Sequence, residues 1–178
     1  VYTSFESMAL TTKFPSGTLT IYNIYRPPDS SAYASTFSSF LSDFSAFLTF
    51  PTTTPHEFLI TGDFNIHVND KTDTHAAQFI DLLTSHSLQQ HVTFATHNQN
   101  NTLDLIITPV QTSLNPAITC SPSTPSDHFL IMTSLNIYPP LPKPATLHSF
   151  RRIASINIEK FIKDIKQSTL ITDPPADL

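Results

Sequence analysis

The chain has 178 residues, a formal net charge of −5, 39% hydrophobic residues and 13% charged residues. This length allows one ordinary domain with a sizeable core, and the acidic balance argues against a protein that holds nucleic acid by overall charge alone. Two glycines are too few for a dinucleotide-binding fingerprint or a Walker phosphate loop, and one cysteine excludes a disulfide framework.

The first predicted elements are a strand, a helix and a second strand. Residues 18–25 are β-rich and carry apolar side chains on both faces, which predicts a strand that is partly buried on each face. Apolar residues then recur at three- and four-residue steps over residues 33–48, as is typical of an amphipathic helix that ends near Pro51. The short apolar run 58–60 predicts a buried strand. The candidate caps of the helix are Asp29, Ser30 and Ser31.

Further elements follow in the same alternating order. Residues 76–83 carry a second helical stripe, and two short apolar runs at 103–108 and 129–135 are flanked by polar turns, as strands are. Strands that alternate with helices indicate an α/β architecture. We therefore expect one α/β domain over residues 1–137.

Composition changes at Pro139. A Pro-rich stretch is typical of a linker, and beyond it apolar residues from Ile158 to Ile165 alternate with lysines. We expect residues 138–178 to form this linker and a basic amphipathic helix outside the main domain. The helix either packs on a further part of the protein or contacts nucleic acid. No apolar run approaches the ~18 residues of a membrane span, and no signal peptide opens the chain, so we expect no membrane partner and a nuclear or cytoplasmic location rather than secretion.

Polar side chains at the ends of the apolar runs are the candidates for chemistry, since open α/β sheets place their sites at strand ends. Asp63 and Asn65 follow the run 58–60 two positions apart, so both project to one side of an extended segment. A carboxylate beside a carboxamide can hold a water molecule and a phosphoryl oxygen together. The alternative interpretation is an Asx turn that closes the strand.

Four further residues are weaker candidates when each is taken alone. Asp127 and His128 precede the run 129–135. They supply either a metal ligand or an orienting carboxylate beside an imidazole of near-neutral pKa. The alternative interpretation is a surface turn. Asp104 lies in an apolar run, where a carboxylate is costly unless it is paired or used. Tyr25 lies at the end of its strand. Its phenol either contacts a phosphate or packs in the core.

The order of these segments carries more information than any one of them. The succession NIYRPP, LITGDFN, NTLDLIIT and PSDHFLI spans residues 22–131. It resembles the endonuclease/exonuclease/phosphatase superfamily and, more narrowly, the endonuclease domain of non-LTR (LINE-type) retrotransposons. Thr96 and His97 also resemble a LINE-type feature, although two histidines such as His67 and His97 lack the spacing of a zinc site. The tail is similar to the start of the linker that leads to reverse transcriptase in such polyproteins.

The resemblance implies a DNase I-like, four-layer α-β-β-α sandwich that nicks DNA by metal-dependent phosphodiester cleavage, with a reverse transcriptase domain in the full-length polyprotein. Asp63 would position or deprotonate the attacking water, and Asn65 and Tyr25 would contact the scissile phosphate. His128 would contact a phosphate oxygen, with Asp127 orienting it near the metal. Asp104 would help to orient the histidine or the leaving group. The implied ligands of Mg²⁺ (or Mn²⁺) are Asp63, Asn65 and Asp127.

The chain departs from the superfamily at its start. In that superfamily an N-terminal strand supplies an Asn and a later strand supplies a Glu, the chief metal ligand, both well ahead of the YRPP-like element. Only 24 residues precede Tyr25, and Glu6 lies in a segment similar to the one just before that element. We therefore expect the first N-terminal strands to be missing and the activity to be impaired. The alternatives are an inactive or co-opted binding module, and a phosphoinositide or small phosphate-ester phosphatase on the same fold.

Overall fold

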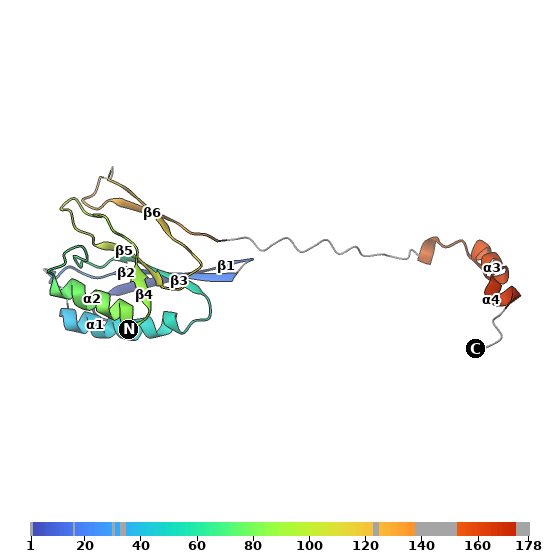
Figure 1. Ribbon diagram of the computed structural model, residues 1–178, viewed down its shortest axis with the longest axis horizontal. Coiled ribbons are helices and arrows are strands. Elements are labelled where there is room, and N and C mark those ends of the chain that lie inside the picture. Colours follow the sequence, from blue (N-terminus) through green and yellow to red (C-terminus); the bar gives the residue numbers. More distant parts are fainter. Residues whose placement is uncertain are drawn as a thin grey trace. The chain divides into compact units, whose positions relative to one another are not determined.

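A five-stranded mixed sheet in the order β1-β2-β3-β5-β4 lies at the centre of the first part of the chain (Figure 1). β2 and β3 are parallel, and the other neighbours are antiparallel. The predicted strands at 18–25, 58–60 and 103–108 are confirmed with slightly different bounds, whereas the other two were not predicted. The strands are β1 (Glu6–Phe14), β2 (Gly17–Tyr25), β3 (Glu57–Asp63), β4 (Leu88–Gln90) and β5 (Asp104–Pro109).

This computed structural model describes residues 2–15, 17–29, 31–32, 35–122, 125–137 and 153–173. The chain divides into two units, residues 1–140 and 141–178. The predicted Pro-rich linker falls on residues 138–152, which lie outside the described residues.

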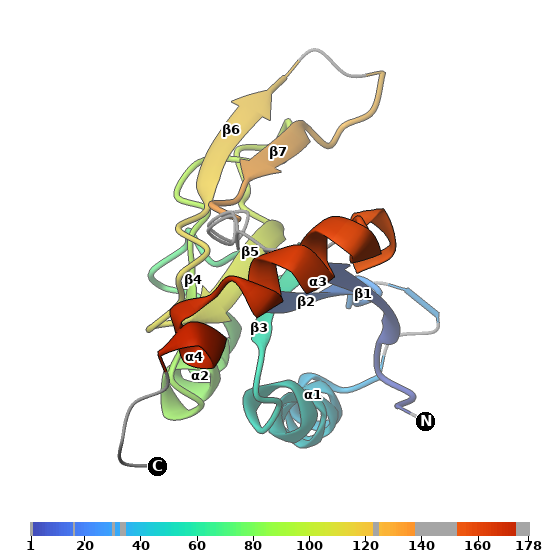
Figure 2. The same cartoon turned by 90° about the vertical axis from the view of Figure 1, so that its right-hand side faces the viewer.

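Two helices cover one face of the five-stranded sheet, α1 (Phe37–Thr52) and α2 (Thr74–Ser85) (Figure 2). The predicted caps of α1 are wrong, because Thr36 is the N-cap and its hydroxyl accepts a hydrogen bond from the Ser39 N–H. The helix also continues through Pro51. The core between the helices and the sheet contains four fully buried aromatic rings, those of Phe40, Phe44, Phe64 and Phe79.

A second, two-stranded antiparallel sheet lies over the other face (Figure 2). It consists of β6 (Ala117–Ser121) and β7 (Leu130–Ser134), and β7 confirms the strand predicted over 129–135. A second apolar cluster, which includes Leu59, Ile106 and Leu114, separates the two sheets. Helices, sheet and sheet are therefore stacked as three layers in the described part of residues 1–137, with a polar rim where the strands end.

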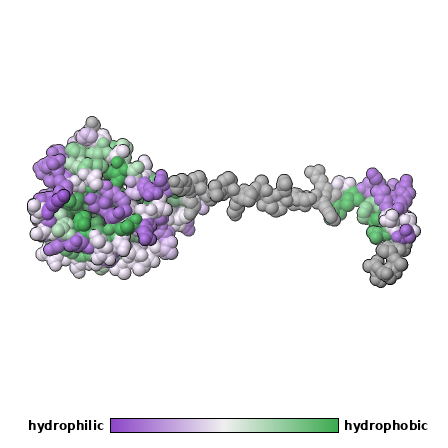
Figure 3. All heavy atoms as spheres, viewed as in Figure 1, coloured by the Kyte–Doolittle hydropathy of each residue, from purple (hydrophilic) through white to green (hydrophobic). Residues whose placement is uncertain are grey.

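The second unit contains the predicted amphipathic helix, α3 (Ile158–Lys166), between the 3₁₀ turn η1 (Ile153–Ser155) and the short α4 (Thr169–Thr172). Asn157 caps α3 by accepting a hydrogen bond from the Lys160 N–H at 2.9 Å. The apolar side chains of α3 are exposed and stand beside its charged ones, so green and purple surfaces adjoin in this unit (Figure 3). In the described part of the chain, no helix is long and apolar enough to cross a membrane.

Candidate active site

Strand register brings three of the predicted site residues together at one rim of the five-stranded sheet. Tyr25 on β2 pairs with Asp63 on β3, and Asp63 pairs with Asp104 on β5. Residues in register share a face of the sheet, and alternation along the strands places this face on the side of Leu59 and Ile106, toward β6 and β7. Tyr25 is 42% exposed, so its ring belongs to the rim rather than to the core.

Gly62 allows β3 to run close to β2 just before Asp63. Its φ is +137°, and a Cβ atom at this position would lie 1.9 Å from the carbonyl oxygen of Ile24. Only glycine adopts this backbone conformation without strain. The residue therefore fixes where the Asp63 carboxylate leaves the strand.

Asp63 and Asn65 form one hydrogen-bonded unit. The backbone N–H of Asn65 donates to Asp63 Oδ1 at 3.1 Å, and Asn65 Nδ2 donates to Asp63 Oδ2 at 3.1 Å. The Asx turn that was the alternative interpretation is thus present, and it holds the carboxylate at the rim. Phe64 anchors the turn, because its fully buried ring packs edge-on against Phe44 at a centroid distance of 5.6 Å.

The environment of Asp63 favours its protonated form. Burial raises the pKa of the Asp63 carboxyl, and the charge of Asp104 raises it further. The Asn65 hydrogen bonds and the charge of His128 act in the opposite direction, and the net result is a pKa above the ordinary value of an aspartate. A carboxylate with a raised pKa is a stronger base toward a water molecule.

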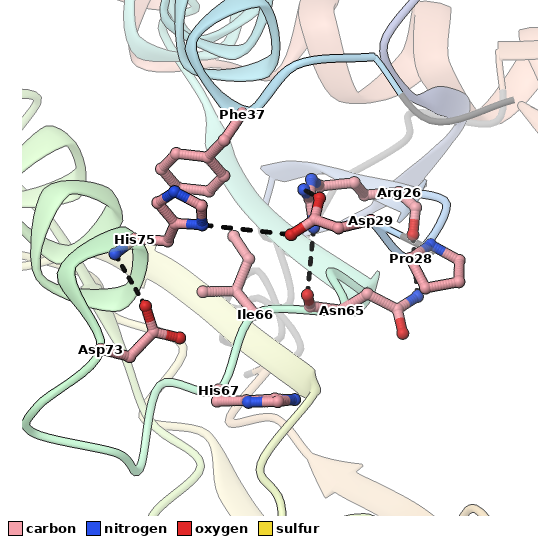
Figure 4. Close-up of a pocket in the computed structure, with 9 residues that line it drawn as sticks. All are labelled: Arg26, Pro28, Asp29, Phe37, Asn65, Ile66, His67, Asp73 and His75. Atoms are coloured by element: carbon pink, nitrogen blue, oxygen red, sulfur yellow. Dashed lines mark hydrogen bonds and ion pairs between the residues drawn. The ribbon is translucent and has the colours of Figure 1, made fainter. Parts of the chain in front are cut away.

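Arg26, which the sequence analysis did not single out, holds this turn through a hydrogen bond. Its guanidinium donates from Nη1 to the carbonyl oxygen of Asn65 at 3.0 Å, forms an ion pair with Asp29, and lies over the Phe37 ring. Arg26 is only 2% exposed. Figure 4 shows it beside Asn65 at a pocket of about 250 Å³, where the His75 ring stacks on Phe37. The motif YRPP contains this arginine, but only the fold shows what it contacts.

His128 forms a close pair with Asp104. Its Nδ1 lies 2.9 Å from Asp104 Oδ2, and because a carboxylate can only accept, Nδ1 carries the proton. Burial lowers the pKa of His128, but the hydrogen bond and charge of Asp104, together with the charges of Asp63 and Asp127, outweigh it and raise the pKa overall. The charges of Asp63, on β3, and of His128, in the segment before β7, therefore influence one another.

Thr96 connects the strand of Asp104 with the segment of His128. Its buried hydroxyl accepts hydrogen bonds from the backbone N–H groups of Leu103, at 3.0 Å, and of Asp104, at 3.1 Å. Its carbonyl oxygen accepts from the Phe129 N–H at 2.8 Å. One threonine thus holds the two halves of the Asp104–His128 pair in register.

Asp127 does not orient His128, which corrects the predicted role. Its Oδ2 lies 3.3 Å from His97 Nε2, and Ser126 Oγ donates to its Oδ1 at 3.1 Å. The hydrogen bond from His97, followed by that from Ser126, lowers the pKa of the Asp127 carboxyl. The Asp127 carboxylate thus contacts His97 whereas the His128 ring contacts Asp104, so Asp104 is the orienting carboxylate.

The rim has the donor set that a hard divalent cation prefers. Asp63 and Asp104 face each other on neighbouring strands, and their repulsion contributes to the raised pKa of Asp63. A bound cation would relieve this repulsion. Mg²⁺ prefers oxygen ligands and commonly relies on one or two carboxylates with several waters. The residues present therefore fit such an ion, with Asp63 and the Asn65 carboxamide as the nearest predicted ligands.

Two stacked sheets with this polar rim define the class of the chain, an α/β protein with the fold of DNase I-like endonuclease domains. A family model described as "Endonuclease-reverse transcriptase" matches residues 19–132, and the chain belongs to this family. The predicted superfamily and the predicted DNase I-like α/β fold are thereby confirmed, and the described part of residues 1–137 forms three of the four layers that were expected.

Two solved structures share the fold at low sequence identity. The endonuclease domain of TRAS1, a telomere-specific non-LTR retrotransposon, is 15% identical with a TM-score of 0.59, over 72% of this chain and 61% of that one. An endonuclease/exonuclease/phosphatase family protein from Leptotrichia buccalis is 12% identical with a TM-score of 0.51, over 74% of this chain and 54% of that one. The chain thus spans less than two thirds of either structure. No curated protein matches it.

Proposed function

We propose that this chain is the endonuclease domain of a retrotransposon protein and that it nicks DNA by metal-dependent hydrolysis of a phosphodiester. The observation that carries the proposal is the meeting of Asp63 and Asp104, on two neighbouring strands, with His128, in the segment before β7, at one rim, although they are separated by up to 65 positions. The family name joins an endonuclease to a reverse transcriptase, so we propose that such a domain accompanies this one in the full-length polyprotein.

Asp63 is the proposed acceptor of the water proton. Asn65 fixes its carboxylate through two hydrogen bonds, so that the oxygens keep one orientation while the water attacks. Its raised pKa brings its basicity closer to what proton transfer near neutral pH requires. Tyr25, next to Asp63 in register, offers its exposed phenol to the same phosphate.

His128 is the proposed donor to the phosphate oxygens. Asp104 accepts the Nδ1 proton of His128 at 2.9 Å and so fixes the orientation of the ring. The raised pKa of His128 increases its protonated fraction near neutral pH. A fixed imidazolium stabilises the negative charge that develops in the transition state.

Asp63 and Asn65, with Asp127 as a third predicted ligand, would hold Mg²⁺ or Mn²⁺. When bound, the metal supplies neutralisation of the charge on the phosphorane and on the leaving oxygen. The 178 residues do not include the Glu that the superfamily resemblance leads us to expect as the chief metal ligand. We therefore propose that they bind the metal weakly and cleave slowly by themselves.

A plasmid-nicking assay tests the proposal. Supercoiled DNA is incubated with Mg²⁺ and an excess of protein, and the wild type is compared with Asp63→Ala and with Asp81→Ala, an exposed carboxylate on α2. We expect slow nicking that EDTA and Asp63→Ala abolish and that Asp81→Ala leaves unchanged. Nicking that persists in Asp63→Ala would refute the proposed site. Phosphate release from inositol phosphates, measured in parallel without DNA nicking, would favour the phosphatase alternative, and neither activity would favour the binding module.

A further inference from the structure

Arg26 contacts the turn that carries Asp63 and Asn65 through both its backbone and its side chain. Its N–H donates to the Asp63 carbonyl oxygen at 2.9 Å, and its carbonyl oxygen accepts from Asn65 Nδ2 at 2.8 Å. Its Nη1 donates to the carbonyl oxygens of Asn65, at 3.0 Å, and of Phe64, at 3.3 Å. We propose that Arg26 is a positioning residue of the proposed cleavage, on which this inference rests, and that it acts by holding this turn rather than by binding DNA.

The turn needs such support because its backbone conformation is unfavourable. Asn65 has a φ of +49°, in the left-handed region, which asparagine adopts more easily than most residues but still at a cost. In this conformation the N–H and the Nδ2 of Asn65 both reach the Asp63 carboxylate. A turn that relaxed toward ordinary backbone would lose these two hydrogen bonds, and the Asp63 oxygens would then lose their fixed orientation.

Arginine suits this position better than lysine does. The guanidinium is planar and presents its N–H donors in a rigid fork, so Nη1 serves two carbonyl oxygens while Nη2 pairs with Asp29. The same group lies over the rings of Phe37, at 5.4 Å, and Phe40, at 5.1 Å. A lysine ammonium is a compact point charge without this plane, and it cannot make all of these contacts at once.

The burial of Arg26 argues for a positioning role and against a direct contact with DNA. Its side chain is 3% exposed, whereas that of its ion-pair partner Asp29 is 56% exposed. Figure 4 shows the guanidinium directed toward Asp29 and Asn65, that is, toward groups of the protein. A buried ion pair is often no more stabilising than apolar residues of similar volume, so stability alone does not explain it. What the pair adds is a fixed direction for the donors that hold the turn.

Nicking at a single turnover and amide hydrogen exchange, both on the whole chain, test this role. Arg26→Lys keeps the charge and removes the fork. The control, Lys71→Arg, exchanges the same two cations at an exposed position. With saturating DNA and Mg²⁺, we expect Arg26→Lys to nick ~10–100-fold more slowly than the wild type, as a small misplacement of a reacting group does. The DNA concentration at half saturation should stay the same, and Lys71→Arg should behave as the wild type does.

Hydrogen exchange reports on the turn itself, without DNA, metal or cleavage. The backbone N–H of Asn65, which donates to Asp63 Oδ1, should exchange several-fold faster in Arg26→Lys than in the wild type. The amide of Ile60, fully buried on β3, should accelerate by a clearly smaller factor, because it reports the stability of the sheet. Should Arg26→Lys fail to fold, Asp29→Asn, which removes the exposed partner of the guanidinium, decides by the same two measurements.

Three results would overturn the proposal. The first is nicking by Arg26→Lys at the rate of the wild type. The second is a loss in DNA binding alone, which would mean that Arg26 contacts a phosphate. The third is an Asn65 amide that accelerates no more than that of Ile60, which would reduce the role to general stability. If the wild type itself did not nick DNA, the proposed function would fail, whereas the exchange measurement would still show whether Arg26 holds the turn.

Discussion

Replacement of Gly62 by alanine should destabilise the domain far more than an ordinary glycine substitution. The added Cβ would lie 1.9 Å from the Ile24 carbonyl oxygen, whereas ordinary contacts begin at 3.4 Å. β2 and β3 would have to separate locally by about 1.5 Å, a large part of the normal strand spacing of ~4.8 Å. This movement would break the ladder at the position that supports Asp63.

The size of the effect follows from two contributions. A non-glycine residue held at a φ of +137° costs ~1–3 kcal/mol, and each lost ladder hydrogen bond costs ~1 kcal/mol. We therefore expect a loss of ~3–5 kcal/mol, a large part of the ~5–15 kcal/mol that stabilises a typical domain. At roughly 3 °C per kcal/mol, the melting temperature should fall by roughly 10 °C or more.

The chain supplies its own control, because its other glycine, Gly17, also has a positive φ, of +157°, but would place a Cβ atom with nothing within 4 Å. Thermal unfolding followed by circular dichroism compares Gly62→Ala with Gly17→Ala. We expect a clearly larger loss for Gly62→Ala, since only this variant adds a clash to the backbone strain. Equal melting temperatures for the two variants would refute the close approach of β2 and β3.

Two further predictions concern the elements that join the site. Thr96→Val keeps the shape of the side chain but leaves the N–H groups of Leu103 and Asp104 without their acceptor. We therefore expect the free energy of unfolding, measured with denaturant, to fall by ~2–4 kcal/mol, and to change little in the control Thr49→Val, at an exposed position. Similar losses in both variants would show that the Thr96 hydroxyl is unimportant. Asp104→Asn removes a charge that raises the pKa of both Asp63 and His128, so both pKa values should fall. Because the proposed reaction needs Asp63 deprotonated and His128 protonated, both limbs of the pH–rate profile of nicking should move to lower pH. A profile that loses amplitude without moving would argue against these roles.

The strands that the sequence predicts carry short apolar runs, and β2, β3, β5 and β7 each lie near the predicted position. These runs are buried in β2, β3 and β5, whereas no residue of β7 is buried. β1 was missed because it is an edge strand whose residues are almost all exposed, so no apolar alternation marks it. β4 has three residues, too few to show a period. A short apolar run is thus what makes a strand predictable from this sequence.

The candidate site, like the fold, is predictable from the sequence only in part. The ordered motifs singled out Asp63, Asp104 and His128. Strand register pairs the two aspartates, and the contact of His128 with Asp104 brings the histidine to the same rim. The partners that hold them depend on contacts between distant segments. Arg26 reaches the carbonyl of Asn65 only because β2 and β3 are neighbours, and no local pattern assigns Asp104 rather than Asp127 to His128.

The convergence of the five-stranded sheet and the His128 segment on one site is tested most directly by titration of His128, followed by NMR of its ring in the absence of DNA and metal. The charge of Asp63 contributes to the raised pKa of His128. The pKa of His128 should therefore be lower in Asp63→Asn than in the wild type, and unchanged in Asp81→Asn, whose carboxylate is exposed on α2. An identical titration of His128 in Asp63→Asn and the wild type would show that the two groups do not share a site, and would contradict the proposed phosphodiesterase.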